Sequence, residues 1–130
     1  MRVLHILPLS TTGGVETMFI NFIKMMSEKN PELLDNHYIY ALSISDNFKY
    51  ELKKIKVNLY IYDHSKDRKL NCLQEIKKII IDHKIDTVYG QNFLGNLLAG
   101  LCKIVVPKKL RVIAHEHGSA WSSTWKLRLA

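Results

Sequence analysis

The order of hydrophobic patterns along the chain limits its fold more than any other feature. Short apolar runs rich in β-branched and aromatic residues alternate with stretches that repeat apolar residues at helical spacing. This strict alternation predicts βαβ units and therefore an α/β fold, with a Rossmann-like, doubly wound parallel sheet covered by helices on both faces. Strands are expected at 2–7, 37–44, 57–62, 86–90 and 110–115, and helices at 15–27, 46–54, 70–83 and 92–105.

The 130 residues have the size of one domain, and their 47% of hydrophobic residues suffices for a core. No apolar run reaches the roughly 18 residues that span a bilayer, and the start of the chain lacks the layout of a signal peptide, so a cytoplasmic protein is expected.

Cys72 and Cys102 are too far apart to indicate a disulfide framework or a Cys-x-x-Cys site. A helical pattern around Trp121 and Trp125 is still open at Ala130, which suggests a piece of a longer protein.

The chain is basic, with 19 Lys and Arg against 12 Asp and Glu and a formal net charge of +7. Such an excess attracts nucleic acid, anionic membranes or phosphorylated small molecules. The sequence has no arginine-rich recognition helix and no aromatic RNA-binding strand, so nucleic acid is not the expected partner. A peripheral contact with the anionic inner face of the membrane remains an expectation, since each lysine near such a surface contributes about 1 kcal/mol.

The first expected strand leads through Ser10 and Thr12 to the pair Gly13-Gly14 and then into the first helix. A strand that turns through glycines into a helix presents backbone N–H groups and the positive end of the helix dipole to an anion, and Glu16 in the first turn complements that dipole. Glycines can equally serve a turn that needs a positive φ or a close chain approach, and both interpretations stay open. The third glycine of the dinucleotide fingerprint is lacking, which disfavours a nicotinamide or flavin site.

Two further segments are expected at the same edge of the sheet, because the carboxyl ends of parallel strands lie together and ligands bind there. Gln91 and Asn92 join a strand to a helix and could contact a polar ligand, although Asn92 could also serve only as a helix cap. His115 and His117, followed by Gly118, project to one side of an extended segment and suit acid/base chemistry or hydrogen bonding. A zinc site would need further spaced ligands, so no metal is expected.

Two residues carry local expectations. His5 lies in the middle of an apolar strand and is expected to be a core histidine with its hydrogen bonds satisfied. Asp46 stands at the start of a helical pattern and is expected to cap that helix.

Two motifs together resemble a known family. The pattern Pro-x-Ser-x-x-Gly-Gly-Val-Glu at residues 8–16 follows a strand and precedes a helix, and Val-Ile-Ala-His-Glu-His-Gly follows at residues 112–118. Together they resemble the N-terminal domain of a family 4 glycosyltransferase with the GT-B fold, of the retaining type that builds bacterial surface glycans such as capsular polysaccharide. The likeness covers essentially the whole chain.

The resemblance implies an activity and a set of partners. Two Rossmann-like domains face each other across a cleft in that family, and residues 1–130 would form the N-terminal, acceptor-side half. The reaction implied is retaining transfer of a sugar from a nucleotide-sugar donor to a glycan or lipid-linked acceptor, usually without a metal or other cofactor.

The resemblance also implies roles for individual residues. Gly13 and Gly14 match the glycine loop that approaches the donor diphosphate, with Glu16 beside them. The family's histidine after the last strand of this domain corresponds to His115 or His117 and would be the catalytic histidine; His117 matches the commoner His-Gly form. The acceptor-binding residues expected at this edge are Ser10, Thr12, Gln91, Asn92, His115 and Gly118.

The family's donor-binding domain, with its nucleotide pocket and paired glutamates, has no counterpart in these residues. Half a cleft neither excludes water nor holds the leaving diphosphate, so the 130 residues alone are expected to be inactive. Two alternatives stay open: a stand-alone α/β module that binds a phosphorylated ligand or a partner chain, and half of a nucleotide-sugar epimerase.

Overall fold

The computed structural model describes residues 1–10, 13–64 and 69–115, and these form an α/β fold, as predicted. Each predicted strand and helix in this part of the chain is present, with ends that coincide or shift by one or two residues. The elements are β1 (Val3–Leu9), α1 (Gly14–Lys29), α2 (Pro31–Leu34), β2 (His37–Ile44), α3 (Asp46–Lys54), β3 (Asn58–Ile61), α4 (Lys69–Asp82), β4 (Thr87–Gln91), α5 (Asn92–Val105) and β5 (Arg111–His115).

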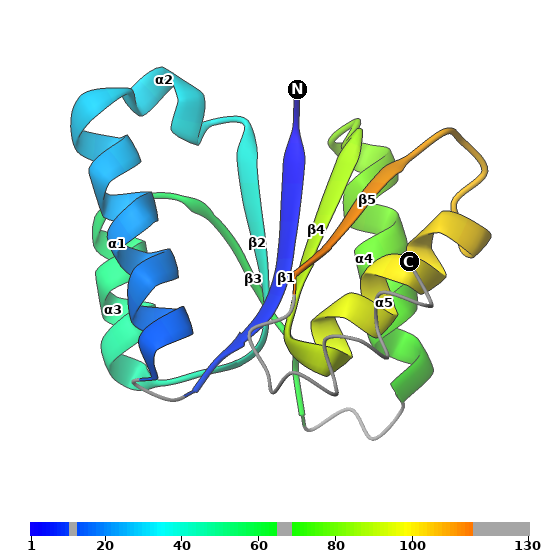
Figure 1. The fold of residues 1–130 in the computed structure, drawn as a ribbon, viewed down its shortest axis with the longest axis horizontal. Helices are drawn as coiled ribbons and strands as arrows, with labels where there is room; N and C mark the ends of the chain where they lie inside the picture. Colours follow the sequence, from blue (N-terminus) through cyan, green and yellow to red (C-terminus); the bar gives the residue numbers. More distant parts are fainter. Residues whose placement is uncertain (11–12, 65–68, 116–130) are drawn as a thin grey trace.

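The five strands form one parallel sheet in the order β3-β2-β1-β4-β5. The chain begins in the middle of the sheet, builds outward through β2 and β3, and then returns to the other side of β1 to add β4 and β5 (Figure 1). The order of the strands therefore reverses between β1 and β4. In doubly wound folds this reversal leaves a crevice at the carboxyl ends of the two strands, where ligands bind.

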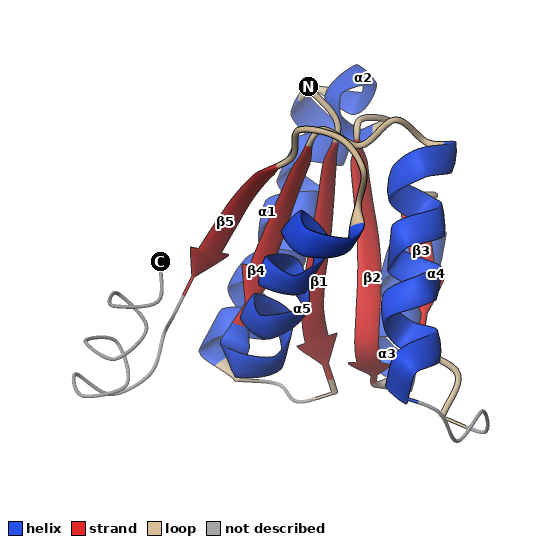
Figure 2. Cartoon of the chain, turned by 90° about the vertical axis from the view of Figure 1, so that its right-hand side faces the viewer, coloured by secondary structure: helices blue, strands red, loops and turns tan. Residues whose placement is uncertain are grey.

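Helices cover both faces of the sheet. The helices α1, α2 and α3 lie on one face, and α4 and α5 lie on the other (Figures 1 and 2). The central strand β1 is buried on both sides: Leu4 and Ile6 pack with α4 and α5, whereas Leu7 and Leu9 pack with α1 and α3. A strand with two buried faces has no polar face to alternate with, which explains its continuous apolar run.

The covering of the α1 face stops at β1. The described residues on this face of β4 and β5 include Tyr89, which is half-buried, and Ile113, which is 38% exposed. Tyr89 pairs in register with His5 of β1 on one side and with Ile113 on the other. The described helices therefore leave an open strip of sheet beside α1.

Two local expectations need correction. Ser45, not Asp46, caps α3, because the Ser45 side chain accepts a hydrogen bond from the backbone N–H of Phe48 at 3.3 Å. Asp46 is the first residue inside the helix, so its side chain comes one position too late for the cap, although its charge still complements the dipole. The short helix α2 is not among the predicted elements, because its four residues are too few for a periodic pattern; Pro31 favours its first turn.

Candidate functional site

The helix α1 begins at the reversal of strand order. Gly13 is the N-cap residue with φ −63° and ψ 166°, and as a glycine it supplies no side-chain cap of its own. Gly14 is the first helical residue and is exposed, as is Ser10 at the end of β1, while Glu16 is half-buried in the first turn. These four predicted residues therefore lie together at the carboxyl edge of the sheet.

The backbone explanation does not hold for Gly14 at this helix start, and Gly13, with φ −63°, has no positive φ either. None of the described glycines has a positive φ, and a Cβ added at Gly14 would meet no atom within 4 Å. The fold therefore requires neither a left-handed conformation nor a close chain approach at Gly14. An open approach to the first turn of α1 is what the missing side chain provides.

The junction between β4 and α5 differs from the expected one. Gln91 is the N-cap residue of α5, makes no side-chain cap hydrogen bond, and is 5% exposed. The alternative that Asn92 only caps the helix is wrong, because Asn92 is already the first helical residue. Its φ of 65° is left-handed, a conformation that asparagine tolerates better than most residues.

His115 ends β5 and is held from two directions. Its Nδ1 lies 2.6 Å from the hydroxyl of Tyr89, and the side chain of Asn96 exchanges two hydrogen bonds of 3.1 Å with its backbone N–H and C=O. Burial raises the pKa of Tyr89, so its phenol keeps its proton and can donate to Nδ1. In that tautomer Nε2 of His115 carries the ring proton and is a hydrogen-bond donor.

His5 is the buried histidine of β1, and only one of its ring nitrogens is paired. Its Nε2 lies 2.9 Å from Nδ1 of His37, but its Nδ1 is buried and has no hydrogen-bond partner. The expectation of a fully satisfied core histidine is therefore confirmed for Nε2 and wrong for Nδ1. Burial, and then the nearby His37, lower the pKa of His5 to about 3, so its ring is neutral near pH 7.

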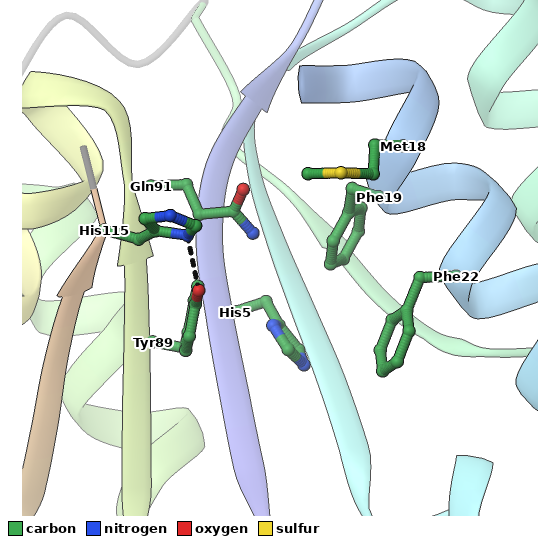
Figure 3. Close-up of a pocket in the computed structure, with 7 residues that line it drawn as sticks. All are labelled: His5, Met18, Phe19, Phe22, Tyr89, Gln91 and His115. Carbon is green, nitrogen blue, oxygen red and sulfur yellow. Dashed lines mark hydrogen bonds between the residues drawn. The ribbon is translucent and has the colours of Figure 1, made fainter. Parts of the chain in front are cut away.

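These polar groups line a cavity of about 300 Å³ between α1 and the sheet (Figure 3). Its two walls differ in chemistry: the sheet supplies polar side chains, and α1 supplies aromatic and thioether ones. Met18 and Phe22 are 55% and 41% exposed, although their helical spacing groups them with the buried Phe19. The lining consists of His5, Tyr89, Gln91 and His115 from the sheet and Met18, Phe19 and Phe22 from α1.

The structure brings some of the predicted residues together and leaves others apart. Gln91 and His115 pair in register and share the cavity, while Gly13 and Gly14 do not line it. Of the remaining predicted residues, Thr12, His117 and Gly118 lie outside the described residues, as does the helical pattern around Trp121 and Trp125.

Sequence reasoning missed Tyr89, Asn96 and the part of α1 that lines the cavity. Tyr89 sits inside a strand, and Asn96 sits inside an apolar helix, where neither carries a recognisable motif. Tyr89 could have been predicted from the pairing of β4 with β1 and β5, which sets it opposite His5 and Ile113. The order of the strands, however, cannot be deduced from local sequence patterns.

Two further observations concern metals and membranes. Among the described residues, no group of three or more His, Cys, Asp or Glu side chains is placed to hold a metal ion. In the same part of the chain, none of the helices has the length and apolar character to cross a bilayer.

Comparison with known proteins gives no family: no family model and no curated protein matches the chain. The interpretation of the site rests on its own chemistry.

Proposed function

We propose that residues 1–130 form the acceptor-side domain of a retaining glycosyltransferase. The donor in this proposal is a nucleotide sugar, and the acceptor is a glycan or a lipid-linked sugar. The observation that carries the proposal is the convergence at the reversal of strand order. The glycine helix start after β1, the Gln91 amide at the end of β4 and the His115 ring at the end of β5 lie at one edge of the sheet.

The two parts of this edge suit two parts of such a reaction. The start of α1 offers backbone N–H groups and the positive end of a helix dipole, which suit a diphosphate. The cavity beside it is lined by uncharged polar groups and aromatic rings, which suit a sugar. A donor with its diphosphate at the start of α1 and an acceptor sugar in the cavity would meet between these two places.

The proposed chemistry needs a second domain but no metal. A leaving diphosphate develops negative charge, and N–H groups at the start of α1 can stabilise part of it. His115, held by Tyr89 and Asn96, would act as a hydrogen-bond donor to the sugar. The nucleotide itself needs a facing domain, so the proposal expects no turnover from these residues alone.

The test is sugar transfer by the product of the complete reading frame that contains these residues. A panel of nucleotide sugars is first screened by calorimetry, and donors that bind are then supplied with membrane extracts as a source of acceptors. The proposal expects one donor to bind and its sugar to appear on an extracted acceptor. If no nucleotide sugar binds, the proposal is wrong.

The same assay separates the two alternatives. An epimerase converts the sugar of its nucleotide sugar without any acceptor, so new nucleotide sugar would appear in the absence of membrane extract. A stand-alone binding module would bind a phosphorylated ligand or a partner chain in these residues alone and transfer nothing.

We also infer a place for the proposed contact with the inner face of the membrane. The outer surface of α5 carries exposed apolar side chains at helical spacing, and exposed lysines lie at its end and just beyond it. Apolar residues flanked by lysines suit an anionic lipid surface. The residues are Phe93, Leu94, Leu97 and Ile104, with Lys103, Lys108 and Lys109.

Co-sedimentation with vesicles tests this contact. The protein should pellet with vesicles that contain phosphatidylglycerol and stay in solution with vesicles of phosphatidylcholine alone. Leu97→Glu should abolish pelleting, whereas Tyr50→Glu, at an exposed aromatic residue of α3 on the opposite face, should not. Equal pelleting with both kinds of vesicle would contradict the proposal.

A further inference from the structure

We propose that the cavity between α1 and the sheet binds the ring of an uncharged sugar, and that this ring is the recognised part of the acceptor. The inference rests on the proposed function only in calling this sugar the acceptor. The cavity itself is defined by seven side chains from α1, β1, β4 and β5 (Figure 3).

The first argument is the unpaired nitrogen of His5. A buried polar atom without a partner destabilises the folded state, and native structures contain few of them. Nδ1 of His5 is such an atom, and its ring lines the cavity. A ligand group that pairs with this nitrogen would remove the cost, so the cavity favours an occupant with a hydrogen-bonding group at that depth.

The second argument concerns which hydrogen-bonding group fits. The neutral ring of His5 carries one proton, either on Nε2, which is paired with His37, or on the unpaired Nδ1. A hydroxyl group can donate to Nδ1 in the first case and accept from it in the second. A carboxylate or phosphate oxygen could only accept, so a hydroxyl is the group that suits both states.

The third argument is the absence of charge. Among the described residues, the seven that line the cavity include no Lys, Arg, Asp or Glu, and the depressed pKa of His5 keeps its ring neutral. An anion placed beside Gln91 and His5 would lose its hydration without gaining an opposite charge, which is strongly unfavourable. The cavity therefore selects against phosphorylated and carboxylated ligands, in contrast to the start of α1.

The fourth argument is the pairing of the two walls. A sugar ring has C–H faces that pack on aromatic rings and a rim of hydroxyls that need polar partners. Phe22 of α1 lies across the cavity from Tyr89 and Gln91 of the sheet, whereas the ring of Phe19 packs edge-on against the ring of His5, with centroids 5.2 Å apart (Figure 3). A volume of about 300 Å³ lies at the lower end of ligand pockets, which suits one ring rather than an extended chain.

Three nitrophenyl glycosides and one charged analogue test the inference on the 130-residue chain, without any donor. The neutral probes are p-nitrophenyl β-D-glucoside, β-D-galactoside and α-D-mannoside, and the analogue is p-nitrophenyl β-D-glucuronide. Titration is followed by amide chemical shifts. We expect saturable shifts at Met18, Phe22, Tyr89 and Gln91 with at least one neutral probe, and binding about tenfold weaker for the glucuronide than for the glucoside.

Paired variants then test the two walls. Phe22→Ala should weaken binding of the best neutral probe about tenfold, and Met25→Ala, which is also exposed on α1 but lies outside the cavity, should leave it unchanged. The amide of His5→Asn lies near the position of Nδ1, whereas that of His5→Gln lies near Nε2. His5→Gln should therefore weaken binding about tenfold, and His5→Asn by less than about threefold.

Several results would overturn the inference. No saturable shift with any neutral probe, a glucuronide that binds as tightly as the glucoside, or equal effects of Phe22→Ala and Met25→Ala would each do so. If both His5 variants fold and weaken binding equally, the role given to Nδ1 is wrong. If either fails to fold, the Phe22 and Met25 pair decides.

The failure of this inference can be told from the failure of the proposed function. If the complete protein transfers sugar but no glycoside shifts these amides, the cavity is not the sugar site, and the proposed transferase function still holds. If glycosides bind but the complete protein transfers no sugar, the cavity is a sugar site but not the acceptor site of a transferase.

Discussion

Two units of the fold have the same local plan, a strand that leads through a glycine-containing segment into a helix, but they differ in what the glycines do. The first is β1 with α1, and the second is β4 with α5; they flank the reversal of strand order and send their helices to opposite faces (Figure 1). A Cβ at Gly14 of the first unit would meet nothing within 4 Å. In the second, a Cβ at Gly90 would lie 2.5 Å from the carbonyl oxygen of Gly95, and one at Gly95 would overlap the carbonyl oxygen of Ile6.

The difference separates glycines that the fold needs from glycines that it does not. Gly90 and Gly95 let α5 approach β4 and β1 more closely than any side chain would allow. Gly14 has no such neighbour, so its lack of a side chain matters only to whatever approaches the start of α1. Both segments had the same appearance in the sequence, as places where N–H groups could meet a ligand.

The largest expected effect is on the stability of the second unit. Gly95→Ala should lower the free energy of unfolding by about 3 kcal/mol, because the new methyl group overlaps backbone that cannot move aside. Urea unfolding followed by circular dichroism measures it. Gly100→Ala is the matched control: it lies in the same helix, has open space around it, and should leave stability unchanged or raise it by about 0.5–1 kcal/mol. Equal stability of the two variants would mean that the fold does not need a glycine at position 95.

The next effect is on the function of the first unit. Gly14→Val in the complete protein should reduce sugar transfer about a hundredfold, since a branched side chain would block the diphosphate from the N–H groups of α1. Its free energy of unfolding should stay within about 0.5 kcal/mol of the parent, because the space around Gly14 is open. Steady-state kinetics and urea unfolding are measured on the same sample. Full activity would mean that no anion approaches this helix start.

A third prediction concerns His5, which lies on the central strand between the two units. Its pKa is about 3 in the folded protein and near 6.5 when unfolded, so acid adds a proton to the unfolded state alone. Stability contributed by this neutral ring is present above pH 6.5 and is lost as the pH falls toward 3. As the pH is lowered from 6.5 toward 3, the free energy of unfolding should decrease more steeply in the parent than in His5→Gln. The difference in slope should be about 1.4 kcal/mol per pH unit. Parallel pH profiles would show that the buried ring gains its proton while still folded.

The smallest effect sharpens the comparison at the cavity. Tyr89→Phe removes the hydrogen bond to His115 and should cost about 1 kcal/mol of stability. Tyr60→Phe is its counterpart, since the hydroxyl of Tyr60 lies 2.8 Å from Nε2 of His83 and away from the cavity. The two variants should be similarly destabilised, but only Tyr89→Phe should weaken glycoside binding. An equal loss of binding in both would mean that Tyr89 acts through general stability.

Much of the fold could be predicted because its signals are local. A strand buried on both faces needs a continuous apolar run, as in β1, and a helix on a sheet needs one apolar stripe, as in α5. The same periodicity grouped Met18 and Phe22 with Phe19. The periodicity does not predict that Met18 and Phe22 line the cavity rather than the core. Their surroundings depend on which strands α1 covers, and this follows from the order of strands in the sheet.

The sequence by itself determined the alternation of strands and helices, hence the parallel sheet and the edge at which Gly14, Gln91 and His115 would lie. Each of these follows from local periodicity and from the geometry of βαβ units. Only the tertiary structure decided that β1 lies between β2 and β4, which sets His5 beside Tyr89 in the lining of the cavity and leaves its buried Nδ1 without a partner. Pairing between distant strands depends on packing across the whole core, and no local pattern records it.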